Sequence, residues 1–279
     1  LQLQSVTLSL GAFAEPSGTG GFSNPNSAFW VAGGLALFTV LFGTRKLDAN
    51  ERHSGVVMAI AVEAVVKLVA LIAVGVFVVW GIAGGVAPML EQIDASPIGT
   101  WQMDKSRWVA LTALSAAAFL CLPRMFQVLV VENDDERHVQ IAAWAFPVYL
   151  LLMSLFVVPI AVVGLDLMPA GSNPDLFVLT IPLAEGREGL AGLSFLGGFS
   201  SATSMVIVAT LALATMVSNH VVMPVWLNAQ GREGALVSGD VRNVVLVARR
   251  ASILMILGLG YLYYRFSGGG AALAAIGLI

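Results

Sequence analysis

Long apolar stretches alternate with short polar segments along the whole chain. A helix that crosses a bilayer takes about 20 apolar residues at 1.5 Å each, and six stretches approach or exceed that length. We predict that they form six membrane-spanning helices. The predicted spans are residues 27–44, 55–83, 107–130, 141–165, 199–224 and 247–264.

The segments between the spans have the composition of loops. Residues 15–26 are rich in Gly, Ser, Asn and Pro, and we interpret them as a loop after the end of a helix at 1–13. Residues 84–106 are polar and contain two prolines, and residues 167–189 are rich in Pro and Gly, so both are predicted to be loops.

The fifth predicted span lies within a run, residues 189–231, that contains no charged residue. The run is roughly twice as long as one crossing needs, so we predict a break at Gly197 and Gly198, with the helix proper beginning near Phe199. Six residues of that helix recur at three-, four- and seven-residue steps and therefore share one face. They are Ser200, Ser204, Leu211, Thr215, Ser218 and Val222. A hydroxyl-bearing face is expected to pack on other helices or to line something polar, and not to face lipid.

Composition places the chain among all-α integral membrane proteins. Of its 279 residues, 58% are hydrophobic and 11% are charged, and the mean hydropathy is +0.87. A soluble domain has about 25% charged residues. The single cysteine, Cys121, excludes an internal disulfide and argues against a metal site built on cysteine. The chain lacks an initiator methionine and stops inside a short apolar run at 271–279, so we expect it to be one piece of a longer protein.

The basic residues of the predicted loops are unevenly divided between the two sides of the membrane. With strict alternation of the spans, one side carries eight Lys and Arg residues and the other carries four. The richer side is predicted to be cytoplasmic, which puts residues 15–26 outside. The eight are Arg45, Lys46, Arg52, Arg137, Arg232, Arg242, Arg249 and Arg250.

Two charged residues, Glu63 and Lys67, lie inside the second predicted span. They are four residues apart on one helical face, so we predict that they pair within the membrane. An isolated charge there costs about 2.5–3.5 kcal/mol on insertion scales. The pair either holds two helices together or lines a route for an ion or a solute.

A proline lies deep in the third span, next to Arg124. Pro123 removes a helical hydrogen bond and predicts a break, and transporters place substrates at broken helices near the middle of the membrane. Arg124 is therefore a candidate ligand for a carboxylate. The alternative is that its side chain extends to the cytoplasmic interface, because Glu132 is only eight residues further on.

The hydroxyl-bearing face also offers oxygen atoms to a cation. Thr215 and Ser218, with the carbonyl groups around Leu211, suit a hard monovalent ion such as Na⁺. The alternative is that these small polar residues allow close helix packing. No motif of a hydrolase, a metalloprotease or a phosphate-binding loop occurs, so we predict no catalytic site and no cofactor in this segment other than a coupling ion.

Several motifs together resemble the sodium/solute symporter family, and most closely the branch fused to a sensor histidine kinase of the histidine-responsive carbon/nitrogen-control type. The motifs are LFGTRKLDANERHSG (41–55), VEAVVKLVA (62–70), FLCLPRMFQVLVVEND (119–134), FPVYLLLMSLFVVPIA (146–161), GGFSSATSMVIVATLALATMVSNHVVMP (197–224) and LGYLYYR (259–265). The resemblance implies a five-plus-five inverted-repeat, LeuT-like bundle. Residues 1–279 would run from the end of core helix three to the start of core helix ten, without core helices one and two.

The resemblance also implies particular site residues. The segment ATMVS (214–218) matches the family's Ser-Thr-x-x-Ser sodium motif at Thr215 and Ser218, whereas Ala214 departs from it and weakens the implied site. Together with Leu211 these residues form the candidate cation site. Glu63 falls where the family often carries an acid. The segment LPRMFQ (122–127) falls on the broken core helix six, which implies substrate contacts. The candidate substrate residues are Phe119, Arg124, Phe126 and Gln127.

Three functions are compatible with these features. The first is uptake of a small amino acid, histidine by resemblance, coupled to Na⁺ or H⁺. The second is sensing, in which the same bundle relays solute occupancy to a cytoplasmic kinase domain and its response regulator. The third is a structural membrane anchor. The expected location is a bacterial inner membrane, and the lipid bilayer and a small solute are the expected partners, with no role for nucleic acid.

Overall fold

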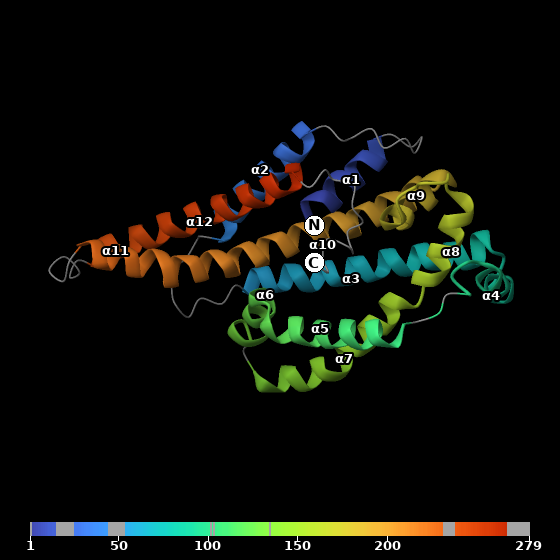
Figure 1. Cartoon of the computed structure of the whole chain (residues 1–279), viewed down its shortest axis with the longest axis horizontal. Helices are drawn as coiled ribbons and strands as arrows, with labels where there is room; N and C mark the ends of the chain where they lie inside the picture. The colour runs from blue at the N-terminus through green and yellow to red at the C-terminus, as the bar shows by residue number, and fades with distance from the viewer. Residues whose placement is uncertain are drawn as a thin grey trace.

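The computed structural model describes residues 2–14, 25–43, 54–100, 102, 104–133, 135–230 and 238–266, and these contain helices without a strand. Figure 1 shows their arrangement. The α-helices are α1 (Gln2–Ala14), α2 (Pro25–Gly43), α3 (Ser54–Val76), α4 (Val86–Ala95), α5 (Lys105–Cys121), α6 (Pro123–Phe126), α7 (Glu136–Ser154), α8 (Val157–Leu167), α9 (Phe177–Ala184), α10 (Glu188–Val217), α11 (Met223–Gln230) and α12 (Ser238–Phe266). Three π-helical segments, η1 (Phe77–Ile82), η2 (Gln127–Val131) and η4 (Ser218–Val222), extend α3, α6 and α10, and η3 (Pro174–Leu176) is a 3₁₀-helix.

The central element is α10, the helix predicted to carry the hydroxyl-bearing face. It packs against α1, α2, α3, α6, α9 and α12, so helices from both halves of the chain meet on it (Figure 1). Its neighbour α3 contributes the largest interface. The sequence pattern therefore identified the helix around which the fold is built.

The predicted break at Gly197 and Gly198 is wrong, because α10 is one uninterrupted helix of 30 residues. Gly197 is buried against α3, where a Cβ atom would lie 3.1 Å from the Cβ of Ala70 and 3.4 Å from the Cα of Lys67. Gly198 has open space around its Cα. The first glycine thus allows two helices to approach closely, which is a common use of glycine in membrane bundles.

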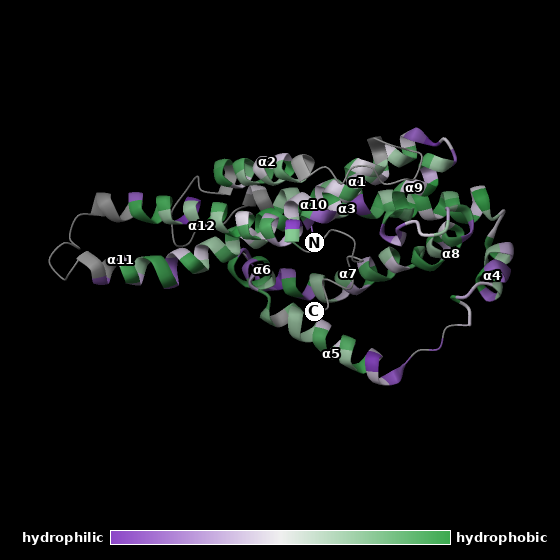
Figure 2. Cartoon of the chain, turned by 45° about the horizontal axis from the view of Figure 1, so that its top comes forward, coloured by the Kyte–Doolittle hydropathy of each residue, from purple (hydrophilic) through white to green (hydrophobic). Residues whose placement is uncertain are grey.

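Four helical stretches are long and apolar enough to cross a membrane: Val57–Ile82, Glu136–Leu167, Glu188–Trp226 and Asn243–Phe266. The first predicted span forms a helix whose apolar part, Ala28–Leu41, is shorter, and the third is interrupted at Leu122. Large apolar side chains are exposed on the outer faces of these helices; Trp144 is 64% exposed and Phe266 is 85% exposed. Such surfaces are rare in water and suit lipid. Figure 2 shows hydrophobic residues along most helices, with hydrophilic ones concentrated in segments such as α4 and the start of α5.

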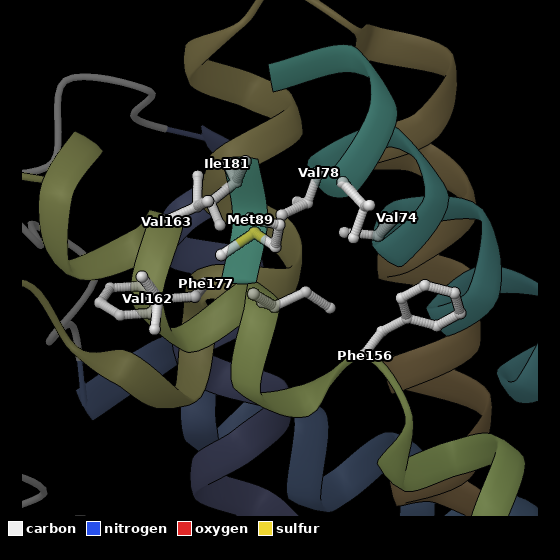
Figure 3. Packing of buried hydrophobic residues seen from close by; sticks show 10 residues of the cluster. Val74, Val78, Met89, Phe156, Val162, Val163, Phe177 and Ile181 are labelled. Carbon is white, nitrogen blue, oxygen red and sulfur yellow. The ribbon is translucent and has the colours of Figure 1, made fainter. Parts of the chain in front are cut away.

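Both segments predicted as long loops, 84–106 and 167–189, contain helices instead, α4 in the first and η3 and α9 in the second. These helices complete a cluster of buried side chains that we call the apolar core (Figure 3). Pro182 lies inside α9 and cannot donate a helical hydrogen bond to the carbonyl of Val178. The hydroxyl of Ser194 in α10 donates to that carbonyl at 2.9 Å, which satisfies the group that proline leaves free. The apolar core consists of Val74, Val78, Val79, Met89, Phe156, Ile160, Val162, Val163, Phe177 and Ile181.

Other predictions lie partly outside the described residues. The helices predicted at 1–13 and 27–44 are confirmed by α1 and α2, whose ends agree to within about two residues, the usual variation at frayed helix ends. The last span begins earlier than predicted, because α12 starts at Ser238. Most of the loop 15–26, the basic residues at 45–52 and the final run 271–279 lie outside the described part of the chain.

Candidate functional site: a polar seam along the central helix

The predicted polar face of α10 is turned toward protein. Ser218 is fully buried, and Ser200, Ser204, Leu211, Thr215 and Val222 are half-buried, so no member of this face is exposed. Leu213 and Met216, on other faces of the same helix, are exposed. The prediction that the hydroxyl groups avoid lipid is confirmed. We call this face, with the residues of α3 that contact it, the polar seam.

The carboxylate of Glu63 in α3 contacts the first half of the polar seam. The hydroxyl of Ser204 donates a hydrogen bond to Oε2 of Glu63, which joins α10 to α3. One residue further along α3, the carbonyl of Ala64 accepts a hydrogen bond of 3.1 Å from the hydroxyl of Tyr149 in α7. Polar contacts therefore tie three helices together at this level of α3.

The predicted ion pair between Glu63 and Lys67 is not formed among the described residues, and the contact with Ser204 corrects that prediction. The carboxylate of Glu63 is directed to Ser204 of α10 and not one turn along its own helix. The backbone of Lys67 lies under Gly197, where α3 and α10 are closest. The side chain of Glu63 is thus held by a contact between helices, and a short serine side chain loses less conformational entropy in such a contact than a long Lys side chain would.

The third predicted span is broken where the proline predicts. Helix α5 begins at the N-cap Asp104, whose carboxylate accepts from the backbone N–H of Ser106 at 2.9 Å. The hydrogen bond from the Ser106 side chain is the main cause that holds the pKa of Asp104 below its ordinary value. The helix ends at Leu122, which has an extended conformation with ψ of 126°, and Pro123 begins α6. Proline is favoured at a first helical position because its missing N–H has no partner there anyway.

The break brings only part of the candidate substrate set toward α10. The short helix α6 packs against α10, and η2 begins at Gln127, whose amide donates to Oε1 of Glu132 at 3.1 Å. The ring of Phe119 instead lies near that of Phe146 of α7, with ring centroids 6.0 Å apart and a tilt of 34°, and Phe126 is 53% exposed. The side chain of Arg124 lies outside the described residues. A shared substrate site for these four residues stays a prediction.

The candidate cation residues lie where α10 changes from an α-helix to a π-helix. Ala214 and Ser218 are buried, and Leu211 and Thr215 are half-buried. The backbone N–H of Ser218 donates to the carbonyl groups of both Ala214 and Thr215. π-Helical turns leave irregular carbonyl geometry and are frequent at functional sites. Sequence reasoning missed this change of helix type, and also η1 and η2.

Two other features escaped sequence reasoning. Ser204 was placed on the polar face but not in the candidate site, although it is the partner of Glu63. Arg249 was counted only as a loop charge, yet it lies inside α12 with its Nε atom buried. In both cases the available signal was a charged residue within an apolar helix, which is Glu63 in the first case and Arg249 in the second. Among the described residues, no group of three His, Cys, Asp or Glu residues is suited to hold a metal ion.

Comparison with known protein families, curated proteins and solved structures found no match to this chain. The resemblance to the symporter family therefore rests on the quoted motifs alone and stays a hypothesis.

Proposed function

We propose that the chain is the membrane-embedded, solute-handling part of a transporter or a transporter-derived sensor, arranged as in the five-plus-five inverted-repeat bundle of the sodium/solute symporters that its motifs resemble. The observation that carries the proposal is the contact between an interrupted helix and the helix that carries the polar seam. Helix α6, which begins directly after the break at Leu122, packs against α10, which carries the polar seam.

Placing polar groups inside a membrane bundle costs free energy, and their presence despite that cost supports a functional role. A structural anchor needs only apolar packing against lipid and neighbouring helices. Here a carboxylate, Glu63, and several hydroxyl groups lie within two of the helices that are long enough to cross the membrane. Ionisable residues in such positions are mostly found on ion or substrate routes.

The coupling ion is proposed to bind near Thr215. Its side chain is half-buried and follows Leu211 by one turn, immediately before the change to π-helix at Ser218. Ala214 supplies no hydroxyl, so fewer side-chain ligands are present than in the symporter motif. Loss of a ligand favours weak Na⁺ coupling, or coupling to H⁺ through Glu63.

The wider setting is part of the same proposal. The chain would lie in a bacterial inner membrane, take up or detect a small amino acid such as histidine, and pass the signal to a kinase domain and a response regulator in the longer protein. A symporter without a kinase uses the same bundle, and solute uptake is the step that both share.

The experiment measures uptake of radiolabelled histidine by the full-length protein in proteoliposomes, over a range of Na⁺ concentrations. Thr215→Ala should raise the Na⁺ concentration for half-maximal uptake by about tenfold, as expected when about 1.4 kcal/mol of ion binding is lost. Thr215→Ser, which keeps the oxygen, should restore most of the dependence. Thr203→Ala is the matched control on another face of α10, where the hydroxyl donates to the carbonyl of Ser200.

Two results would contradict the proposal. Uptake that is absent from the wild-type protein under Na⁺ and under a proton gradient would favour the anchor. Equal shifts in Thr215→Ala and Thr203→Ala would remove Thr215 from the ion site.

A further inference from the structure

Two buried side-chain atoms have no hydrogen-bond partner among the described residues: the hydroxyl oxygen of Ser218 and the Nε atom of Arg249. The side chain of Ser218 is completely buried, with 0% exposure. A buried polar group without a partner costs about 1–3 kcal/mol, and a charged one costs more. Native structures rarely keep such groups without a reason.

The two atoms come from elements that pack together at the same height. Helix α12 packs against η4 and α10, and the chain runs along α12 in the direction opposite to α10, so both arms of this helical hairpin extend to the same side of the connection at 231–237 (Figure 1). Ser218 lies thirteen residues before that connection and Arg249 lies twelve residues after it. Because each helical residue advances the chain by about 1.5 Å, the two residues lie at nearly equal distances from the hairpin end.

Both groups can donate a hydrogen bond to a shared partner. Nε of arginine carries a proton and cannot accept, and the guanidinium keeps its positive charge at all physiological pH values. A serine hydroxyl can both donate and accept, and the hydroxyl of Ser218 forms no hydrogen bond among the described residues. Because Nε of arginine can only donate, a partner shared by the two groups must be an acceptor, and a guanidinium favours a negatively charged one.

We propose that Ser218 and Arg249 form a binding site for an oxyanion, a phosphate or a carboxylate, between η4 and α12. A guanidinium forms its strongest hydrogen bonds with planar or tetrahedral oxyanions, and a hydroxyl donor completes such a site. Arg249 lies six residues into the stretch Asn243–Phe266, about 9 Å from its start, which is within reach of a lipid phosphate at the interface. The same position admits a free anion from the aqueous side.

This assignment changes the role of Ser218 but does not depend on transport. A guanidinium at the height of Ser218 repels Na⁺, so the hydroxyl is better suited to an oxyanion than to the cation predicted from the sequence. The cation proposal then rests on Thr215 and Leu211. The two proposals are tested by separate results. The sodium dependence of uptake in Thr215→Ala tests the cation site, and the effect of anions on the stability of Arg249→Gln tests the oxyanion site.

The test uses the purified full-length protein in nanodiscs, and it measures the thermal unfolding temperature. The first arm compares phosphatidylcholine alone with phosphatidylcholine containing phosphatidylglycerol. The second adds inorganic phosphate or acetate to the neutral nanodiscs at constant ionic strength. An anion at a hundredfold excess over its Kd should raise the unfolding temperature of the wild type by about 5 °C or more. Arg249→Gln and Ser218→Ala should lose most of that rise.

The neighbouring exposed arginine supplies the matched control. Arg250→Gln removes one positive charge from the adjacent position of α12 and should keep the full rise. In neutral nanodiscs without added anion, Arg249→Gln should be no less stable than the wild type, because it removes a charge whose buried Nε has no partner among the described residues. A purely structural role for Arg249 predicts the opposite.

The two arms identify the source of the oxyanion. A rise in the first arm alone assigns the site to a lipid headgroup, and a rise in the second alone assigns it to a free anion. If Arg249→Gln shows the same rise as the wild type in both arms, or if no anion raises the wild-type temperature, the site does not exist.

Discussion

The apolar core and the polar seam both include residues of α3, yet they hold that helix to its neighbours by different means. In the apolar core, aromatic rings lie directly on glycines: a Cβ atom at Gly75 would overlap the ring of Phe156, and one at Gly164 would overlap the ring of Phe177. The contacts there depend on shape alone, since the cluster contains no charged or hydroxyl-bearing side chain.

In the polar seam, helices approach through small residues and are joined by hydrogen bonds. Gly197 of α10 lies against Ala70 of α3, and Ser204 donates to Glu63 across the same interface. Tyr149 adds a third helix through the carbonyl of Ala64. Here the identity of individual atoms matters as much as their volume.

The comparison shows which region is suited to respond to a ligand. Lipid tails are as apolar as a leucine side chain, so packing in the apolar core is favoured by close fit and not by escape from water. Such a region has no reason to change when ions or solutes arrive. Hydrogen-bonded carboxylates and hydroxyl groups can exchange partners with an ion, a proton or a solute, so the seam is the part expected to change.

The largest predicted effect tests the apolar core. Phe177 is buried in α9 and its ring fills the space above Gly164. Phe177→Ala should lower the free energy of unfolding by about 3 kcal/mol, at the lower end for a buried phenylalanine, because lipid supplies no hydrophobic driving force. Chemical unfolding in detergent measures the loss, with Phe266→Ala, at a residue 85% exposed, as the control. Equal losses in the two variants would show that the cluster is not a stabilising core.

The apolar core is also where sequence reasoning failed most. The segments that supply Met89 and Phe177 looked like loops because they contain glycines, prolines and charged residues. Residues 177–184 are apolar but too short to signal a helix, and Pro182 argues against one. That helix tolerates the proline because most of its residues are buried or half-buried and because Ser194, sixteen residues away from Val178, satisfies the carbonyl that the proline leaves free. A compensation of this kind depends on tertiary structure, so no local sequence pattern predicts it.

A middle-sized effect is predicted at the glycine pair of α10. Gly197→Val adds atoms at a position where even a Cβ would lie 3.1 Å from Ala70 and 3.4 Å from the backbone of Lys67. We expect a loss of about 2 kcal/mol, within the usual range for overpacking. Gly198→Val is the matched control, since nothing lies within 4 Å of its added Cβ. Thermal unfolding of the two variants compares them directly, and a larger loss at Gly198 would contradict the packing of α10 on α3.

The seam itself was predicted better than the contacts made along it. The helical spacing of the hydroxyl-bearing residues identified the buried face of α10, and Pro123 identified the break before α6. Both signals are local in the sequence. The partner of Glu63 was not predictable in the same way. Lys67 satisfied the helical spacing for a pair, whereas Ser204 is 141 residues away from Glu63 in the sequence. The π-helical turn at Ser218 has no known local signal in this chain, since it follows an ordinary run of helix-forming residues.

The smallest predicted effect tests whether the contact between Ser204 and Glu63 is specific. Ser204→Ala leaves the carboxylate of Glu63 without its partner and should cost about 1 kcal/mol, because hydrogen bonds between membrane helices contribute about 0.6 kcal/mol on average and about 1.7 kcal/mol at most. Ser201→Ala removes the same atom from a half-buried neighbour and should cost less. A double-mutant cycle with Glu63→Gln isolates the pair. A coupling energy near zero in that cycle would mean that α3 and α10 are joined at this level by packing alone, and the seam would then resemble the apolar core more closely than the present contacts indicate.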